Sequence, residues 1–295
     1  MTNLDMKTLA SQYTMGEILN CTLMQQGTSS AAMLLETTLG RFVLRQLRDE
    51  GQALAEYEVY EALAPAKLSP SILCTKEGLP YITLGHMIYN VQTYIEKVVP
   101  QHSLSLNYVE LGEVIAHFHQ RILPLDMARL GQKDRFALPS LWEAVSGDIL
   151  NSSSEVIRRL ASHVEECCKY QSKHTAVIHG DLGLWNVLFT ESHMYIIDVG
   201  EVRRGNHHFD LAAILSSTCS SSITVCELEE RMVQLERGYR SEGRDVNREI
   251  LYEQIHLWVI RGLLAIIREK GIIAPTIPYV ERNLAFLGKC QTVMS

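Results

Sequence analysis

The sequence predicts an α+β protein, with a small antiparallel sheet near the N-terminus and a mostly helical remainder. Between residues 18 and 47, short β-prone runs alternate with turn residues, a pattern typical of antiparallel strands. Between residues 111 and 122, apolar residues recur at the spacing of one face of a helix. The 295 residues, 46% of them hydrophobic, suit either one large domain or two lobes with sizeable cores.

The elements follow from local patterns in chain order. Strands are expected at residues 18–24, 32–37, 42–47, 72–74 and 81–84. A helix is expected at residues 51–63, ended by Pro65 and Pro70, and further helices at 111–122, 226–239, 248–270 and 279–290. Gly271 and Pro275 mark the break between the last two helices.

Charge and cysteine content exclude several classes of protein. The net charge is −7, from 27 basic and 34 acidic residues without a Lys/Arg block, so no nucleic-acid partner is expected. The 7 cysteines include no Cys-x-x-Cys pair, which suggests neither a disulfide framework nor a zinc site. Charged residues interrupt the longest apolar stretch, 257–274, and the first 12 residues lack the pattern of a secretory signal. We therefore expect a cytoplasmic protein that does not span a membrane.

The most informative stretch of the chain ends at Asp198. Residues 187–190 and 194–197 are apolar, β-prone runs separated by a polar triplet, which predicts an antiparallel hairpin. Asn186 and Asp198 flank the open end of this hairpin. Because paired strands lie about 5 Å apart, an amide oxygen and a carboxylate so placed can share one hard cation.

A second spacing in this stretch points to phosphoryl transfer. Asp181 precedes Asn186 by five positions. The catalytic-loop Asp and Asn of protein kinases have the same offset, and there the Asp accepts the hydroxyl proton while the Asn holds magnesium. The stretch is therefore interpreted as the centre of a phosphotransferase.

These residues resemble the aminoglycoside phosphotransferase and choline kinase superfamily. Its pattern is His-x-Asp, a four-residue gap, Asn, then Ile-Asp and a later Asp-Leu-Ala, and every piece is present here in order. The resemblance implies a bilobal, protein-kinase-like fold with a small antiparallel-sheet N-lobe and a mostly helical C-lobe. The implied roles are general base for Asp181, magnesium ligands for Asn186 and Asp198, loop anchor for Asp210 and loop brace for His179.

Matches to the nucleotide-binding residues of the family are weaker. Arg45 matches the basic residue that contacts nucleotide phosphates; most of the family pattern has Lys there, although choline-kinase-like members use Arg. A solvated Arg at a strand end is the alternative. Glu56 matches the Glu that pairs with this cation, and Glu58 is its rival because sequence does not fix the helix boundary. Either one could instead be an exposed helix carboxylate.

The polar loop between the first two strands offers backbone N–H groups and small hydroxyls to phosphate oxygens. It lacks the triple-glycine pattern of protein kinases, so an ordinary hairpin turn is an equal alternative. The candidate phosphate-binding residues of this loop are Gly27, Thr28, Ser29 and Ser30.

Residues 85–88 lie where the family places its interlobe hinge. The resemblance therefore implies that adenine bonds backbone groups near His86 and Ile88. It also implies a nucleotide-binding lobe over residues 1–86 and a helical lobe, with the catalytic loop and the acceptor site, over residues 87–295. A plain strand-to-helix connection is the alternative at this point.

Two pairs of histidines in the sequence do not indicate metal sites. His117 and His119 are two residues apart on a predicted helix and point to nearly opposite sides, so hydrogen-bonded core histidines are expected. His207 and His208 are expected on the surface of a loop.

The resemblance implies ATP- and Mg²⁺-dependent transfer of the γ-phosphoryl group to a hydroxyl of a small molecule, of the aminoglycoside, choline, homoserine or sugar type. GTP in place of ATP is left open. The alternatives are a catalytically inactive nucleotide-binding regulatory module and a protein-directed kinase. Only eleven residues separate Asp198 from Asp210, and the Ala-Pro-Glu element of protein kinases is missing, so a small acceptor is favoured.

Overall fold

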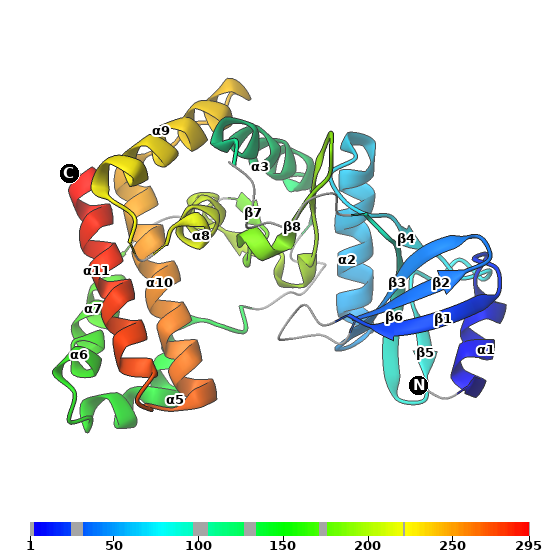
Figure 1. Cartoon of the computed structure of the whole chain (residues 1–295), viewed down its shortest axis with the longest axis horizontal. Coiled ribbons are helices and arrows are strands. Elements are labelled where there is room, and N and C mark those ends of the chain that lie inside the picture. The colour runs from blue at the N-terminus through cyan, green and yellow to red at the C-terminus, as the bar shows by residue number, and fades with distance from the viewer. Residues whose placement is uncertain are drawn as a thin grey trace. The chain divides into compact units, whose positions relative to one another are not determined.

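The computed structural model describes residues 3–24, 32–96, 106–126, 134–170, 176–220 and 222–294 (Figure 1). The chain divides into two compact units, each made of three segments. The first unit comprises Met1–Leu104, Arg121–Gln132 and Val187–Gly200. The second unit comprises Ser105–Gln120, Lys133–Asn186 and Glu201–Ser295.

The first unit is built on a six-stranded antiparallel sheet with the order β1-β2-β3-β6-β4, in which β5 also pairs with β6. Leu44 lies opposite Val91, and both share a buried core with Leu35. Leu9 and Tyr13 belong to the same core, so α1 and the residue after it cover one face of the sheet. The elements are α1 (Asn3–Gln12), β1 (Ile18–Leu23), β2 (Ala32–Thr37), β3 (Gly40–Leu47), β4 (Ile72–Leu73), β5 (Ile82–Leu84) and β6 (Met87–Thr93).

Helix α2 (Glu50–Leu63) follows β3 and packs against β3 and β6. Its N-cap is Asp49, whose carboxylate accepts a hydrogen bond from the backbone N–H of Gln52 and so satisfies one of the free amides of the first turn. The short 3₁₀ helix η1 (Ala64–Ala66) contains Pro65 and ends α2 where the sequence predicts.

The predicted hairpin is present in the first unit. Strand β8 (Val187–Phe189) pairs antiparallel with β9 (Met194–Ile196), with Val187 opposite Ile196. The backbone N–H of Ile196 donates to the carbonyl of Leu68, which joins the hairpin to the connection after α2. The 3₁₀ helix η3 (Val199–Glu201) follows.

The second unit is mostly helical and is organised around α10 (Arg248–Lys270), which packs against α5, α7, α8 and α11 (Figure 1). The side chain of Asn247 caps the start of α10, and Gly271 ends it with a φ of 75° that suits glycine. Strand β7 (Ala176–Ile178) pairs with β10 (Arg203–Gly205). The other elements are α3 (Tyr108–Ile122), α5 (Leu138–Leu150), α6 (Glu155–Arg158), α7 (Leu160–Cys167), η2 (Leu184–Asn186), α8 (His208–Thr218), α9 (Val225–Ser241) and α11 (Thr276–Met294).

Among the described residues, α10 is the one helix long and apolar enough to cross a membrane. Its most apolar window is 56% buried inside the protein, and four other helices pack against it. These are the properties of a core helix.

Residues 85–88 form neither the expected interlobe hinge nor the alternative strand-to-helix connection, because they belong to the β5–β6 hairpin. Gly85, with a φ of 64°, and His86 form the turn between β5 and β6. Residues 88–93 of β6 then pair with β3, because the apolar side chains of β6 complete the core of the sheet. The first unit therefore continues past the expected boundary, to Leu104.

The expectation that His207 and His208 lie on a loop surface is also wrong. His207 is the N-cap residue of α8 and His208 is its first residue. His208 is buried, and its Nε2 atom lies 2.9 Å from the backbone nitrogen of Asn247, from which it accepts a hydrogen bond. The ring thus satisfies a backbone group near the start of α10.

Candidate active site

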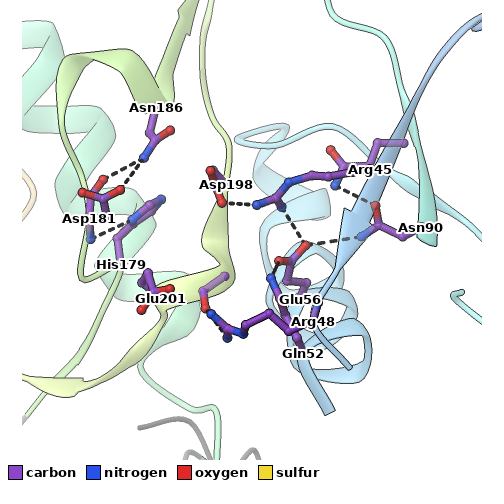
Figure 2. Close-up of polar contacts among 12 residues, drawn as sticks. Arg45, Arg48, Gln52, Glu56, Asn90, His179, Asp181, Asn186, Asp198 and Glu201 are labelled. Atoms are coloured by element: carbon purple, nitrogen blue, oxygen red, sulfur yellow. Dashed lines mark hydrogen bonds and ion pairs between the residues drawn. The ribbon is translucent and has the colours of Figure 1, made fainter. Parts of the chain in front are cut away.

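In the first unit, Arg45 is the centre of a charged cluster (Figure 2). It lies on β3 with 8% of its surface exposed, so it is not the solvated strand-end Arg of the alternative interpretation. One guanidinium nitrogen donates to Glu56 Oε2 at 2.9 Å, and the other terminal nitrogen donates to Asp198 Oδ1. One cation thus holds two carboxylates from a helix and from the segment after β9.

Glu56, and not Glu58, pairs with Arg45. The Glu56 side chain is fully buried on α2 and also accepts hydrogen bonds from Gln52 Nε2 at 2.6 Å and from Asn90 Nδ2 at 3.3 Å. Glu58 is partly exposed. Burial raises the pKa of the Glu56 carboxyl, Arg45 and the hydrogen bonds from Gln52 and Asn90 act in the opposite direction, and the net pKa is raised.

Two opposing effects act on Arg45. Burial lowers the pKa of its guanidinium, but the negative charges of Glu56 and Asp198 outweigh this, and the net pKa is raised. Arg45 is therefore a permanent positive charge inside the first unit. Such a charge is suited to the phosphates of a nucleotide.

Asp198 has an unusual backbone. Its φ is 59°, one of two positive values among the described residues other than glycine. This left-handed conformation is tolerated by Asp but disfavoured relative to the common regions, and such residues cluster at functional sites. The side chain is 31% exposed, so part of the carboxylate is accessible to a ligand.

In the second unit, the loop after β7 carries Asp181, and Asp210 anchors this loop. Asp210 lies in the first turn of α8 and is completely buried. Its Oδ2 accepts from the backbone N–H of His179 at 2.7 Å, and its Oδ1 accepts from Gly180 at 3.0 Å. His119 Nε2 lies 2.9 Å from Oδ2, and Tyr239 Oη contacts the other ring nitrogen of His119.

The contacts of Asp210 keep it ionised. Burial raises the pKa of its carboxyl. The hydrogen bond and charge of His119, with the backbone N–H of Gly180, lower it by more than burial raises it, so the net pKa is lowered. The anchor role expected for Asp210 fits these contacts. His119 is buried, while His117 contacts Glu242 instead, so the two histidines face different partners as expected.

The loop holds Asp181 and Asn186 together. The backbone N–H of Asp181 donates to His179 Nδ1 at 3.2 Å, which is the contact expected of a brace. Asn186 Nδ2 donates to the backbone carbonyl of Asp181 at 2.8 Å and approaches its Oδ2 at 3.4 Å. In Figure 2 the amide oxygen of Asn186 points away from Asp181. That oxygen is the atom that would bind a cation.

Gly180 is required in this loop because Arg203 passes directly beneath it. The φ of Gly180 is 81°, and a β-carbon there would lie 1.7 Å from Nη1 of Arg203. Arg203 donates to the carbonyl of Glu201 and pairs with Asp134 at 3.4 Å. Arg261 donates to Asp134 at 2.9 Å. Any side chain at position 180 would displace this network under the loop.

The sequence did not identify this network or its neighbouring aromatic residues. Arg261 was visible only as a charge inside an apolar helix, and that was the available signal, because a buried Arg needs a partner. Burial and Arg203 lower the pKa of Arg261 to about 10, while Asp134 and Asp181 act in the opposite direction. Trp185, 52% exposed, stacks on Trp258 with 6.4 Å between the ring centres.

The structure does not assign the remaining nucleotide-binding candidates. Gly27, Thr28, Ser29 and Ser30 lie outside the described residues. His86 is in a hairpin turn and Ile88 lies inside β6, opposite Leu47 of β3. The backbone groups of Ile88 are thus in the middle of the sheet, not at a point where the chain leaves it.

The candidate residues therefore fall into two described groups. Arg45, Glu56 and Asp198 are joined in the first unit, and Asp181 and Asn186 are joined in the second. The first group combines a fixed cation with an accessible carboxylate. The second combines a half-buried carboxylate with an oriented amide. Fixed cations, oxygen ligands and a base are the parts that phosphoryl transfer uses.

Comparison with known structures shows the fold. A spectinomycin phosphotransferase crystallised with ADP and spectinomycin has a TM-score of 0.72 at 17% identity, covering 98% of this chain and 99% of that one. An amicoumacin kinase in complex with AMP-PNP and Ca²⁺ has a TM-score of 0.77 at 13% identity, covering 99% and 94%. A choline kinase from Cryptosporidium parvum Iowa II has a TM-score of 0.60 at 14% identity, covering 92% and 89%.

Comparison of sequences shows the family. The protein LicA homolog of Mycoplasma capricolum subsp. capricolum is 24% identical over 169 residues, which are 57% of this chain and 66% of that protein. The chain thus spans slightly less than two thirds of the length of this relative. The model of the phosphotransferase enzyme family matches residues 20–248, which is more than half of the chain. The protein belongs to the phosphotransferase enzyme family.

Proposed function

We propose that the protein is a kinase that transfers the γ-phosphoryl group of ATP, with Mg²⁺, to a hydroxyl of a small molecule. The observation that carries this proposal is the Asp181–Asn186 pair on a loop whose backbone is anchored by Asp210. A loop held this rigidly can aim a carboxylate at one acceptor oxygen. Positioning of that kind supplies most of the rate in phosphoryl transfer.

Arg45 is proposed to hold the ATP phosphates, with Glu56 keeping the guanidinium in place. The two oxygen donors proposed for Mg²⁺, the Asp198 carboxylate and the Asn186 amide, fit a hard cation, and the partial exposure of Asp198 supports this assignment. Bound there, Mg²⁺ would neutralise charge on the phosphate oxygens.

Asp181 is proposed to orient the acceptor hydroxyl and to receive its proton. The bond between the γ-phosphorus and the bridging oxygen of ADP breaks, a bond from the acceptor oxygen to that phosphorus forms, and the hydroxyl proton passes to the Asp181 carboxylate. The hydrogen bond from the Asp181 backbone N–H to His179 and the one from the Asn186 amide to the Asp181 carbonyl limit the positions that Asp181 can adopt.

The acceptor is proposed to lie against the second unit, beside Trp185 and Arg261. Trp185 follows Asp181 by four residues and presents an exposed aromatic face. Arg261 is buried, yet its Nη1 has no hydrogen-bond partner among the described residues. Aromatic faces and unpaired donors are typical of sites that bind a polar small molecule.

The relatives support an acceptor that carries hydroxyl groups, since their names refer to spectinomycin, amicoumacin and choline. The proposed acceptor is of the aminoglycoside, choline, homoserine or sugar type. All seven cysteines are free, which supports a reducing cytoplasm, where ATP is also available.

The test is phosphoryl transfer by an Asp181→Asn variant, using a panel of amino alcohols, amino sugars and antibiotics with the full-length protein. We expect wild-type turnover with at least one acceptor and a fall of about 10²–10⁴-fold in the variant, with nucleotide affinity changed only a few-fold. Asp148→Asn, on the exposed side of α5, is the matched control. Equal turnover in both variants would remove Asp181 from catalysis, and ATP binding without transfer to any acceptor would favour a regulatory module.

A second measurement locates the acceptor. Trp185→Ala should raise the KM for the acceptor about 5-fold while leaving the KM for ATP unchanged, because the loss of an aromatic contact is worth about 1 kcal/mol. Tyr279→Ala, which removes an exposed aromatic residue of α11, should change neither constant. A shift in the KM for ATP alone would place Trp185 at the nucleotide instead.

A further inference from the structure

Outside the candidate active site, α7 and α10 bring together three residues able to bind a metal ion. His163 and Glu166 come from α7, and His256 comes from α10, which packs against α7. One ligand atom from each of the three lies within 4.8 Å of the other two. His163 and Glu166 are three residues apart, so they share one face of α7. The proposed phosphotransfer does not use any of these residues.

The two imidazoles already face each other through the atoms that would bind a cation. Nδ1 of His163 lies 2.9 Å from Nε2 of His256. On the other side of His256, Nδ1 contacts the hydroxyl of Tyr170. A histidine that binds a metal through one nitrogen commonly has a hydrogen-bonding partner on the other, which fixes the ring and its tautomer.

Two imidazole nitrogens at hydrogen-bonding distance share a single proton between them, because one must donate and the other accept. A metal ion that binds both nitrogens takes the place of that proton.

The geometry needs little adjustment. In a tetrahedral site with zinc–nitrogen bonds of about 2.05 Å, two nitrogen ligands lie about 3.3 Å apart. The nitrogens of His163 and His256 are within about 0.4 Å of that separation. Glu166 is exposed, so its side chain can rotate toward the pair at small cost.

We propose that His163, Glu166 and His256 form a zinc-class metal site that links α7 to α10. Two imidazoles with one carboxylate favour a borderline divalent transition ion over Mg²⁺ or Ca²⁺, which prefer all-oxygen sites. A water molecule completes four-coordination on the exposed side. Tyr170 orients His256 from outside the ligand set. The site stabilises the helix pair and is chemically separate from the Mg²⁺ that serves ATP.

The first experiment measures Zn²⁺ binding by the chelator-treated, full-length protein, in competition with a chromophoric chelator and with excess Mg²⁺ present. We expect one Zn²⁺ per chain with micromolar or tighter affinity. His163→Ala and Glu166→Gln should weaken binding at least 10-fold, and Tyr170→Phe about 10-fold. His193→Ala removes an exposed histidine of the β8–β9 turn, and Cys168→Ser an exposed thiol beside α7, so both should bind as the wild type does.

His163 is preferred over His256 for substitution because it is only partly buried, and circular dichroism verifies that each variant is folded. Zn²⁺ should raise the Tm of the wild type and of His193→Ala, but not that of His163→Ala. If the wild type binds no stoichiometric Zn²⁺, or His163→Ala binds it equally well, the three residues are a hydrogen-bonded packing contact between helices and the proposal is wrong.

Co²⁺ identifies the ligands. In place of Zn²⁺ it should give the visible absorption of a four-coordinate nitrogen and oxygen site, without a thiolate charge-transfer band. A charge-transfer band that Cys168→Ser or Cys226→Ser removes would assign the metal to an exposed thiol and overturn the proposal.

Discussion

Asp210 and Asp198 both belong to the motif that identifies the family, yet their surroundings differ. Asp210 is completely buried, and His179, Gly180 and His119 occupy its two oxygens. Asp198 is 31% exposed, sits on a left-handed backbone and contacts Arg45. A carboxylate whose acceptors are filled by the protein fixes a loop. One that keeps an accessible oxygen on a strained backbone is suited to a ligand.

Replacing each carboxylate in turn tests this comparison. Asp210→Ala should lower the free energy of unfolding by about 3–5 kcal/mol, because it leaves two buried backbone N–H groups and His119 without an acceptor. Asp198→Ala should destabilise the protein far less, yet should abolish stabilisation by Mg-ATP. Urea denaturation and thermal shift with and without Mg-ATP measure the two effects. Equal losses of stability would show that Asp198 is also structural.

A smaller effect is expected from changes to the cation of the first cluster. Arg45→Ala should lose most activity and destabilise the first unit, because Glu56 is left buried without its partner. Arg45→Lys should keep partial activity, since a charge remains but the fork that reaches two carboxylates does not. Steady-state kinetics against ATP measure this. Arg41→Ala is the matched control on the same strand, because the ion pair of Arg41 with Glu96 is exposed. Wild-type kinetic constants for ATP in all three variants would show that Arg45 is dispensable.

The smallest effect concerns pH. Burial lowers the pKa of His207 to about 4 and that of His208 to about 3. Below about pH 6.5 the unfolded chain therefore binds protons at these two rings, whereas the folded protein does not. Stability is therefore full above pH 6.5 and declines toward pH 4, by at most about 1.4 kcal/mol per pH unit for each ring. Asp210, with a lowered pKa, adds a loss only at still lower pH.

Urea denaturation at several pH values checks this order of losses. His208→Gln should flatten the decline between pH 6.5 and 4, whereas His193→Gln, at an exposed site, should leave it unchanged. A wild-type curve that is flat from pH 7 to 4 would contradict the assignment of neutral, buried rings.

Local patterns predicted the elements that carry the proposed chemistry. The strands at 18–47, the hairpin after Asn186 and the long C-terminal helices all appear where apolar periodicity and turn residues placed them. The contact of Asp210 with the loop followed from the family pattern. These features depend on neighbours in sequence or on a fixed motif, so one sequence suffices to find them.

Features that depend on distant segments could not be predicted. Arg203 and Arg261 meet at Asp134, which has no motif around it. The position of His86 was misjudged because a tight hairpin turn and an interlobe connection have similar composition. The pairing of His163 with His256 crosses 93 positions between two helices, and helix α7 was not predicted at all. Cysteine spacing suggests no zinc site, and two histidines on different helices leave no such spacing in the sequence.

The segmented first unit constrains how the chain folds as it is made. Arg45 and Asp198 are 153 positions apart, and the β8–β9 hairpin reaches the ribosome exit long after the sheet it accompanies. At about 5–20 residues per second, that interval is on the order of 10–30 s. During that interval Arg45 can pair with Glu56, but the hydrogen bond from Ile196 to the carbonyl of Leu68 cannot yet form. The first unit therefore completes its folding only when much of the second has been synthesised, and the two units mature together.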